Sequence, residues 1–296
     1  MTPPLRILLL TTALAATLAA CNRDRETAPA DATGDLGSTA AAVTPADAAA
    51  PMAFQSKTPF ANVSLTLPAA IKAQPDLHAR LYAEEVRKLR QFTEGAQGER
   101  TEAGNDPDRP PYEKSVTVAA AAETAKLFSL KRVDYDYSGG AHPNTLTTGI
   151  LWDKALKRQI GLPDLFRKGA DLTVLDQALC TAINAAKRAR SPDGPGVTLN
   201  GSDWTCPRVA DTAFVLTPGS VAGKAAGLTF LIGPYQVGPY AEGGYEIALP
   251  ATLFRSLLEV AYADEFGGQL ARAGDVTPDL APAVPAVAKP RAKTAG

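Results

Sequence analysis

Residues 134–144 gather the side chains of this chain that are best suited to chemistry, in the order Asp-Tyr-Asp-Tyr-Ser-Gly-Gly-Ala-His-Pro-Asn. His142 stands out because an imidazole gains or loses a proton near neutral pH. Two glycines before it permit a tight turn and a proline after it stiffens the exit, so we expect a turn that presents His142 between two strands. On one interpretation, Tyr135, Tyr137 and His142 form a recognition surface. On the other, His142 is a turn residue bonded to a backbone carbonyl.

A second segment, residues 233–244, places two tyrosines among proline and glycine residues. The segment is too short to form a hydrophobic core of its own. Tyr235 and Tyr240 are therefore open to two interpretations. They form a stacking platform for sugar rings or a protein partner, or they cap a sheet edge while their hydroxyl groups bond to backbone.

The motifs of the common enzyme classes are missing from the sequence. Its two histidines, His78 and His142, are too few for a histidine-based metal cluster, and there is no G-x-S-x-G, P-loop or dinucleotide-binding pattern. We therefore expect no metal, no cofactor and no catalytic activity. Carboxylates are plentiful, so a cell-wall hydrolase or esterase that uses Asp134 and Asp136 stays open as an alternative. His78 lies off the apolar stripe of its expected helix, and we expect it on the surface.

The overall charge excludes one large class of proteins. Lys and Arg number 30, and Asp and Glu number 31, among 296 residues, which gives a formal net charge of −1. Nucleic-acid-binding proteins carry a clear excess of positive charge, so no nucleic-acid partner is expected.

The N-terminal residues resemble the export signal of a bacterial lipoprotein. Arg6 precedes an apolar run that ends before Cys21, and this run is shorter than the ~20 residues of a membrane-spanning helix. The sequence Leu-Ala-Ala-Cys that ends at Cys21 resembles a lipobox. Residues 1–20 are thus predicted to be a signal peptide, and Cys21 the lipidated residue that holds the chain on a membrane. An aspartate directly after the lipidated cysteine is the usual signal for retention in the inner membrane, and this chain has Asn22 there. We therefore expect an outer-membrane lipoprotein that faces the periplasm, with the inner membrane and the cell surface as alternatives.

Composition divides the rest of the chain into three parts. Residues 21–52, rich in Ala, Asp, Thr and Pro, and residues 268–296, a Pro- and Ala-rich tail, cannot bury enough apolar surface to fold, so both are predicted to be disordered. Residues 53–267 are predicted to form one domain with a hydrophobic core of its own.

Two cysteines remain once Cys21 is lipidated. Cys180 and Cys206 are an even pair, and exported proteins meet an oxidising environment, so we predict a disulfide between them. Two buried free thiols are the alternative, and zinc binding is not expected because neither cysteine has a second ligand at metal spacing.

Hydrophobic periodicity predicts an α+β fold: a largely antiparallel sheet packed with two or three helices. The first helix is expected to begin near Pro75, with Asp76 as N-cap, the second to cover residues 171–190, and the third to start at Pro250. A short helical turn is expected at residues 162–166 and a polar loop at residues 95–111. Strands are expected at residues 62–67, 112–120, 127–137, 146–153, 213–216, 227–232 and 245–249.

Several of these segments together resemble a known family. The Tyr-x-Tyr-Ser-Gly-Gly-Ala-His-Pro-Asn run at 135–144, the Leu-Pro-Asp-Leu-Phe run at 162–166 and the segment 233–250 resemble signatures of the extracytoplasmic domain of unknown function found in RsiV-type anti-sigma factors and beside PdaC-type peptidoglycan deacetylases. The resemblance covers roughly residues 54–265. It implies an α+β envelope domain, in places used to bind lysozyme.

The function predicted from these features is that of a lipid-anchored periplasmic binding module. Its partners would be the membrane, through Cys21, and peptidoglycan or a lysozyme-like protein, through the His142 turn and the loop with Tyr235 and Tyr240. A cell-wall hydrolase or esterase, a lysozyme inhibitor and a purely structural envelope protein are the alternatives.

Overall fold

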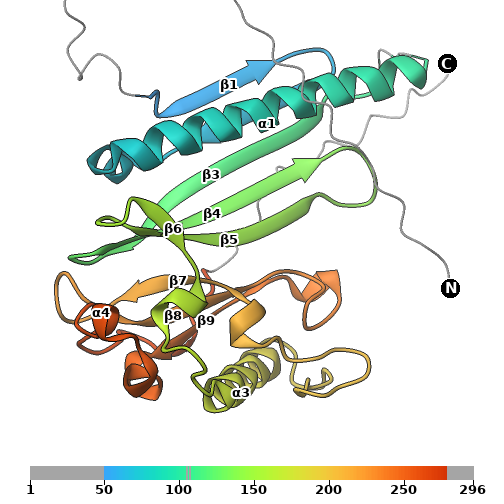
Figure 1. Ribbon diagram of the computed structural model, residues 1–296. Helices are drawn as coiled ribbons and strands as arrows, with labels where there is room; N and C mark the ends of the chain where they lie inside the picture. Colours follow the sequence, from blue (N-terminus) through green and yellow to red (C-terminus); the bar gives the residue numbers. More distant parts are fainter. Residues whose placement is uncertain (1–49, 105, 107, 279–296) are drawn as a thin grey trace, which may run out of the picture. The chain divides into compact units, whose positions relative to one another are not determined.

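A computed structural model describes residues 50–104, 106 and 108–278 (Figure 1). The expected signal peptide, the lipidation site at Cys21, the expected linker up to residue 49 and the end of the expected tail, residues 279–296, lie outside the described residues.

The first half of the fold is a six-stranded sheet in the order β1-β2-β3-β4-β5-β6. All its neighbours pair antiparallel except β2 and β3, which run parallel because a helix, α1, crosses between them. Its strands are β1 (Ala53–Lys57), β2 (Ala61–Thr66), β3 (Tyr112–Glu123), β4 (Leu127–Tyr137), β5 (Asn144–Asp153) and β6 (Arg158–Ile160).

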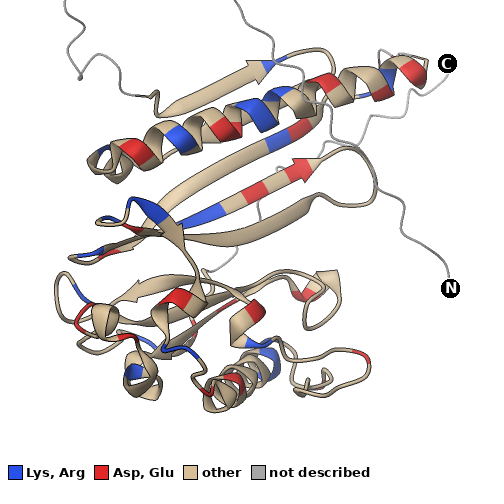
Figure 2. Ribbon diagram, in the orientation of Figure 1, with Lys and Arg blue, Asp and Glu red and all other residues tan. Residues whose placement is uncertain are grey.

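Helix α1 (Pro75–Glu102) lies across one face of this sheet (Figure 1). Leu77, Leu81 and Leu89 are buried against residues of β2–β5, which forms the α1-side core. Basic and acidic residues occur along the whole of α1 (Figure 2), and most of them are exposed, as is usual for the solvated side of a surface helix.

The start of α1 differs from the prediction in two ways. Pro75 is the first helical residue and Gln74 is the N-cap, so Asp76 belongs to the first turn and is not the cap. His78 is buried, 2% exposed, and not on the surface. Its Nε2 donates a hydrogen bond to the carbonyl oxygen of Pro51 at 3.1 Å, because the chain that enters β1 passes over this turn of the helix.

The polar loop predicted at residues 95–111 is also wrong, because α1 continues to Glu102. The contact that holds this extension is Arg100, which is buried and donates to four backbone carbonyls. They belong to Pro59, Asp106, Arg109 and Pro110, at 2.7–3.3 Å. The glycines at 95 and 98 indicated a loop, and these tertiary bonds outweigh their weak helix preference.

The second half of the fold is a four-stranded antiparallel sheet in the order β10-β9-β8-β7. Its strands are β7 (Ala213–Pro218), β8 (Ala225–Ile232), β9 (Tyr245–Pro250) and β10 (Gly274–Asp275). Helix α3 (Thr173–Arg190) contacts β9 and β10. Because β10 pairs with β9, the folded part extends beyond Gly267, where the sequence indicated the start of the tail.

The two sheets pack on each other chiefly through contacts of β7 with β3 and β5. Leu127 of β4 and Leu151 of β5 join residues of β7–β9 and α3 in a second core. The approach is close at Gly149, where a Cβ would overlap the carbonyl oxygen of Phe214. The layers therefore run α1, first sheet, second sheet, α3 (Figure 1).

The helix predicted to start at Pro250 is broken into short pieces. Two 3-10 turns, Ala251–Leu253 and Arg255–Leu257, precede α4 (Val260–Ala263). Leu258, between the second 3-10 turn and α4, is extended because it forms a β-bridge with Phe166. The short helical turn predicted at residues 162–166 is present as α2 (Leu162–Leu165).

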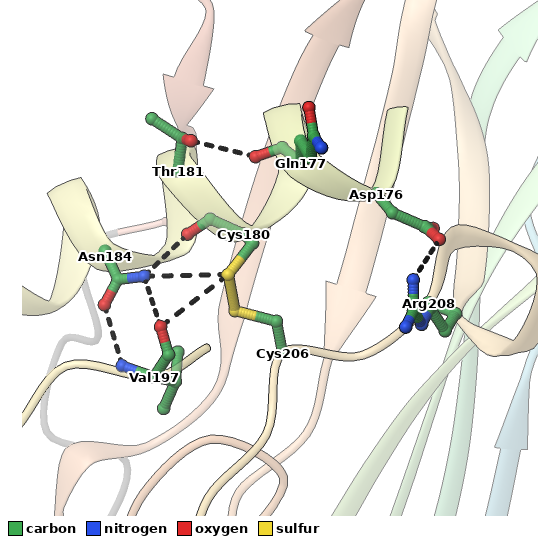
Figure 3. Close-up of a disulfide and its surroundings, with 8 residues drawn as sticks. All are labelled: Asp176, Gln177, Cys180, Thr181, Asn184, Val197, Cys206 and Arg208. Carbon is green, nitrogen blue, oxygen red and sulfur yellow. Dashed lines mark hydrogen bonds and ion pairs between the residues drawn. A yellow bond between two sulfur atoms is a disulfide. The ribbon is translucent and has the colours of Figure 1, made fainter. Parts of the chain in front are cut away.

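The predicted disulfide joins Cys180 of α3 to Cys206, 26 residues later (Figure 3). A cross-link that closes a loop of this length stabilises the fold by about 3.5 kcal/mol on the loop-entropy relation. The Asn184 side chain ties the same loop to α3, since it donates to the carbonyl of Val197 at 2.8 Å and accepts from its amide at 2.9 Å. Asp176 bonds Arg208 at 3.0 Å on the other side of the disulfide (Figure 3).

The α+β class with largely antiparallel pairing is confirmed, and the strands divide between two sheets. A search of the described helices found none with the length and apolar character needed to cross a membrane.

Candidate functional site

The His142 turn, residues 138–144, connects β4 to β5. Gly139 and Gly140 have φ of 95° and 107°, a backbone conformation that side chains disfavour, so the turn depends on glycine. The hydroxyl of Tyr137 donates to the carbonyl of Gly140 at 3.1 Å and closes it. His142 is exposed, as predicted.

The tyrosine loop, residues 233–244, connects β8 to β9. Its first half is a tight turn in which the amide of Gly233 donates to the side chain of Gln236 at 2.8 Å. Tyr235 adopts φ of 67°, which is uncommon for a residue with a side chain, and it is 55% exposed. Tyr240 opens the 3-10 turn Tyr240–Glu242.

The two segments meet and form one aromatic cluster of His142, Tyr235 and Tyr240. The His142 and Tyr240 rings stack with centroids 3.8 Å apart and planes 15° apart. Tyr235 completes the cluster, with its ring centroid 5.5 Å from that of Tyr240 and 6.3 Å from that of His142. The two distances from Tyr235 are in the range of favourable aromatic pairs, and the His142 and Tyr240 rings lie closer together, nearly parallel.

Hydrogen bonds fix the protonation pattern of the neutral cluster. The carbonyl of Pro143 accepts from Nδ1 of His142 at 3.0 Å and from the Tyr240 hydroxyl at 2.8 Å. A carbonyl can only accept, so Nδ1 carries the proton and Nε2 accepts from the Tyr235 hydroxyl at 3.3 Å. The backbone bonds that one interpretation gave to His142 and Tyr240 are present, both to the carbonyl of Pro143, and the recognition role of the other interpretation stays a prediction.

Tyr135 and Tyr137 extend from β4 toward the face of the first sheet opposite α1. Tyr135 lines a groove of about 280 Å³ on this face, together with residues of β1, β2 and β3. Burial and the nearby carboxylate of Glu113 raise the pKa of the Tyr135 hydroxyl, so it is a neutral donor at physiological pH. Tyr137 supports the His142 turn and is not stacked in the cluster.

The neighbouring acids do not join this surface. Arg132 holds Asp134 at 2.6 Å and also forms a two-pronged ion pair with Glu85 of α1 at 2.8 Å. Asp136 lies 4.0 Å from Lys114. Because successive residues of a strand face opposite sides, Asp134 and Asp136 lie on the α1 side, away from the tyrosines.

The sequence did not indicate the ion pair between Lys187 of α3 and Glu242, which holds the tyrosine loop on that helix. Lys187 of α3 is 4% exposed and donates to the carbonyl of Val237 at 2.7 Å and to the carboxylate of Glu242 at 2.6 Å. Tyr245 donates to the same carboxylate at 2.9 Å. Arg190, stacked on the Tyr245 ring at 3.8 Å, bonds the carbonyl of Gly244 at 2.7 Å. The loop is therefore fixed at its middle and its end by one helix.

Metal binding has no support among the described residues, where no group of three or more His, Cys, Asp and Glu side chains is placed to hold an ion.

Comparison with protein families identifies the domain. Residues 54–145 match the family described as deacetylase PdaC, and residues 163–252 match the protein of unknown function family DUF3298. The chain carries a PdaC/DUF3298-like domain of unknown function. The family predicted from the sequence is thereby confirmed, and the tyrosine loop lies within the DUF3298 segment. The His142 turn lies at the end of the PdaC segment, so the aromatic cluster joins the two.

Solved structures similar to the PdaC/DUF3298-like domain include two DUF3298 family proteins. One, from Bacteroides fragilis, is 19% identical, with a TM-score of 0.48 over 69% of this chain and 86% of its own. The other, from Pseudomonas aeruginosa, is 16% identical, with a TM-score of 0.49 over 75% of this chain and 99% of its own. The search of curated proteins found no match.

Proposed function

We propose that this chain is a non-enzymatic binding module of the bacterial envelope, anchored to the outer membrane through a lipid on Cys21, facing the periplasm. Its ligand is peptidoglycan glycan or a lysozyme-like protein. The observation that supports the proposal most is the aromatic cluster, in which two turns distant in sequence join the exposed His142 and Tyr235 with the half-buried Tyr240.

The construction of this cluster fits binding. Aromatic side chains that are held rigidly lose little conformational entropy when a ligand stacks on them. Here Tyr240 is fixed by the carbonyl of Pro143, and its loop is fixed by Lys187. Exposed aromatic residues on rigid loops are typical of recognition surfaces.

Retention on isolated peptidoglycan sacculi and on immobilised lysozyme tests the proposal, with the full chain purified in mild detergent. We expect retention on one of the two, and at least tenfold weaker retention for Tyr240→Ala and His142→Ala. Val260→Ala is the control, because Val260 is 84% exposed and outside the cluster. The proposal would be contradicted if the wild type were retained on neither material, or if both cluster variants were retained as strongly as the wild type.

The same samples test the alternatives. Release of muropeptides or acetate by the chain, abolished by Asp134→Asn, would show an enzyme. Inhibition of lysozyme without turnover would show an inhibitor, which uses the same surface for a protein ligand.

The anchor is tested separately by labelling cells with a radioactive fatty acid. The chain should carry label and sediment with outer membranes, and Cys21→Ser should abolish both. An unlabelled wild-type chain would contradict the lipid anchor and leave the binding proposal unaffected.

A further inference from the structure

The groove beside the cluster is built from two rows of side chains that the strand register aligns. In one row Gln55, Ser64, Ser115 and Tyr135 lie opposite one another across β1, β2, β3 and β4. In the next row Lys57, Asn62 and Glu113 do the same across β1, β2 and β3. All point away from α1, because the alternate residues Val63, Leu65 and Val116 are buried in the α1-side core.

The groove presents polar groups that have no partner within the described protein. Gln55, Asn62, Ser64, Ser115 and Tyr135 form no side-chain hydrogen bond to any described residue, although all line the same groove. Their amides and hydroxyls offer both donors and acceptors. Ligand atoms placed in the groove therefore find several free hydrogen-bonding groups within one surface.

The charges in the groove select the class of ligand. Lys57 and Glu113 offset each other on the open face, and Lys114, which also lines the groove, lies 4.0 Å from Asp136, so the groove has no large excess of charge for a polyanion or a polycation. An extended peptide adds to the free edge of a sheet through its backbone, whereas this surface is a sheet face whose backbone groups are already paired. Uncharged hydroxyl and amide groups beside an aromatic ring suit a sugar.

Strands β4 and β5 connect the groove to the aromatic cluster. Tyr135 lines the groove and pairs with Thr145 of β5, and the turn that joins these two strands carries His142. A ligand in the groove thus extends toward the stacked rings of His142 and Tyr240.

We propose that this groove binds an uncharged glycan chain, whose hydroxyl or acetamido groups bond Asn62, Ser64 and Ser115 while the adjoining sugar rings stack on the aromatic cluster. This inference rests on the proposed binding function and assigns its ligand class. Ser115 and Asn62 are then specificity-determining residues.

Isothermal titration of the full chain in mild detergent tests the inference with three probes: chitotetraose, cellotetraose and heparin. We expect the two neutral tetrasaccharides to bind and heparin not to bind. Preference for chitotetraose assigns the acetamido group as a recognised element; equal binding assigns the hydroxyls alone.

Groove variants locate the site. Ser115→Val and Asn62→Ala should weaken tetrasaccharide binding at least tenfold. Thr117→Val is the matched control, because Thr117 lies on the same face of β3 two residues away and does not line the groove. Gln55→Ala is a third groove variant, and its exposed position in the edge strand β1 should leave the fold intact.

The outcomes separate this inference from the proposed function. No tetrasaccharide binding at millimolar concentration, or binding that Ser115→Val, Asn62→Ala and Gln55→Ala leave unchanged, overturns the glycan groove. If Tyr240→Ala still abolishes retention on sacculi or lysozyme, the binding module stands without it. If the wild type is retained on neither and binds no sugar, both proposals fail.

Discussion

Lys187 shows how a single buried residue determines the position of the candidate site. Its ammonium group has lost its water and is compensated by the Glu242 carboxylate and the Val237 carbonyl. Removing one partner of a buried ion pair leaves the other charge uncompensated. We therefore expect Lys187→Met to lower the free energy of unfolding by about 3–5 kcal/mol, measured by urea denaturation.

A matched lysine separates this effect from loss of charge in general. Lys157 pairs with Asp76 at 2.8 Å, but its side chain is 70% exposed, so Lys157→Met should leave the urea midpoint near the wild-type value. The double variant Lys187→Met with Glu242→Gln should recover part of the loss. Equal midpoints for Lys187→Met and wild type would show that the ion pair does not hold the loop.

The buried hydroxyl of Tyr262 should make the free energy of unfolding depend on pH in the alkaline range. Its burial and the hydrogen bond that it donates to Asp153 at 2.7 Å raise the pKa of its hydroxyl to about 12, against about 10 in the unfolded chain. Below pH 10 both states are protonated and the contribution is fully present. Between pH 10 and 12 the unfolded chain releases the proton first, so stability falls as pH rises. We expect a loss of about 1–3 kcal/mol across this window in urea titrations.

The control for this prediction is Tyr262→Phe. It removes the hydroxyl, so part of the pH dependence between 10 and 12 should disappear; Tyr245, whose pKa is also raised to about 12 by burial and the hydrogen bond to Glu242, supplies a further part. The same slope in wild type and Tyr262→Phe would contradict the assignment.

At the scale of elements, Gly95 in α1 and Gly139 in the His142 turn should respond to alanine in opposite directions. Gly95 lies in the helix interior with no atom near the position of a Cβ. Alanine favours a helix over glycine by about 0.5–1 kcal/mol, so Gly95→Ala should stabilise the protein by that amount. Gly139→Ala should destabilise it, because φ there is 95°. Thermal denaturation of both variants measures the difference, and no gain at Gly95 would indicate that α1 ends earlier.

Most strands were predictable because apolar and polar residues alternate in them, as at Val63 and Leu65 in β2. The end of α1 was not, because its cause is the contact of Arg100 with the carbonyl of Pro59, distant in sequence, and with three carbonyls of the segment that follows the helix. Strand β10 has only two residues and no period of its own; it forms because β9 offers a free edge. Long-range contacts, which local patterns do not encode, decide all of these cases.

The candidate site shows the same division. The sequence indicated both segments of the cluster, since histidine and tyrosines among glycine and proline are unusual in a core. It did not indicate that His142 would stack on Tyr240, nor that Lys187 would support Glu242, because these pairs join residues on different elements. The groove was missed as well, because only the register of β1 to β4 aligns its side chains.

At the scale of the whole molecule, strands of the first sheet contribute side chains to both hydrophobic cores. In β5, Ile150 and Trp152 belong to the α1-side core, whereas Leu151 belongs to the second core. The amide of Leu216 in β7 donates to the Ser129 hydroxyl of β4 at 2.9 Å, in a fully buried contact. Neither core is complete without strands that also serve the other, so we expect the domain to unfold as one cooperative unit although two family segments match it.

The two tryptophans of the chain report on one core each, which makes this expectation testable. Trp152 is buried in the α1-side core, and Trp204 packs on the second core. Fluorescence of Trp204→Phe therefore follows the first core, and that of Trp152→Phe follows the second. When the same destabilising change, Leu228→Ala in the second core, is added to both, it should lower the free energy of unfolding by about 2–5 kcal/mol in both and shift both urea midpoints equally. A shift confined to the Trp204 signal would mean that the sheets unfold separately, and the aromatic cluster between them would then open whenever either sheet did.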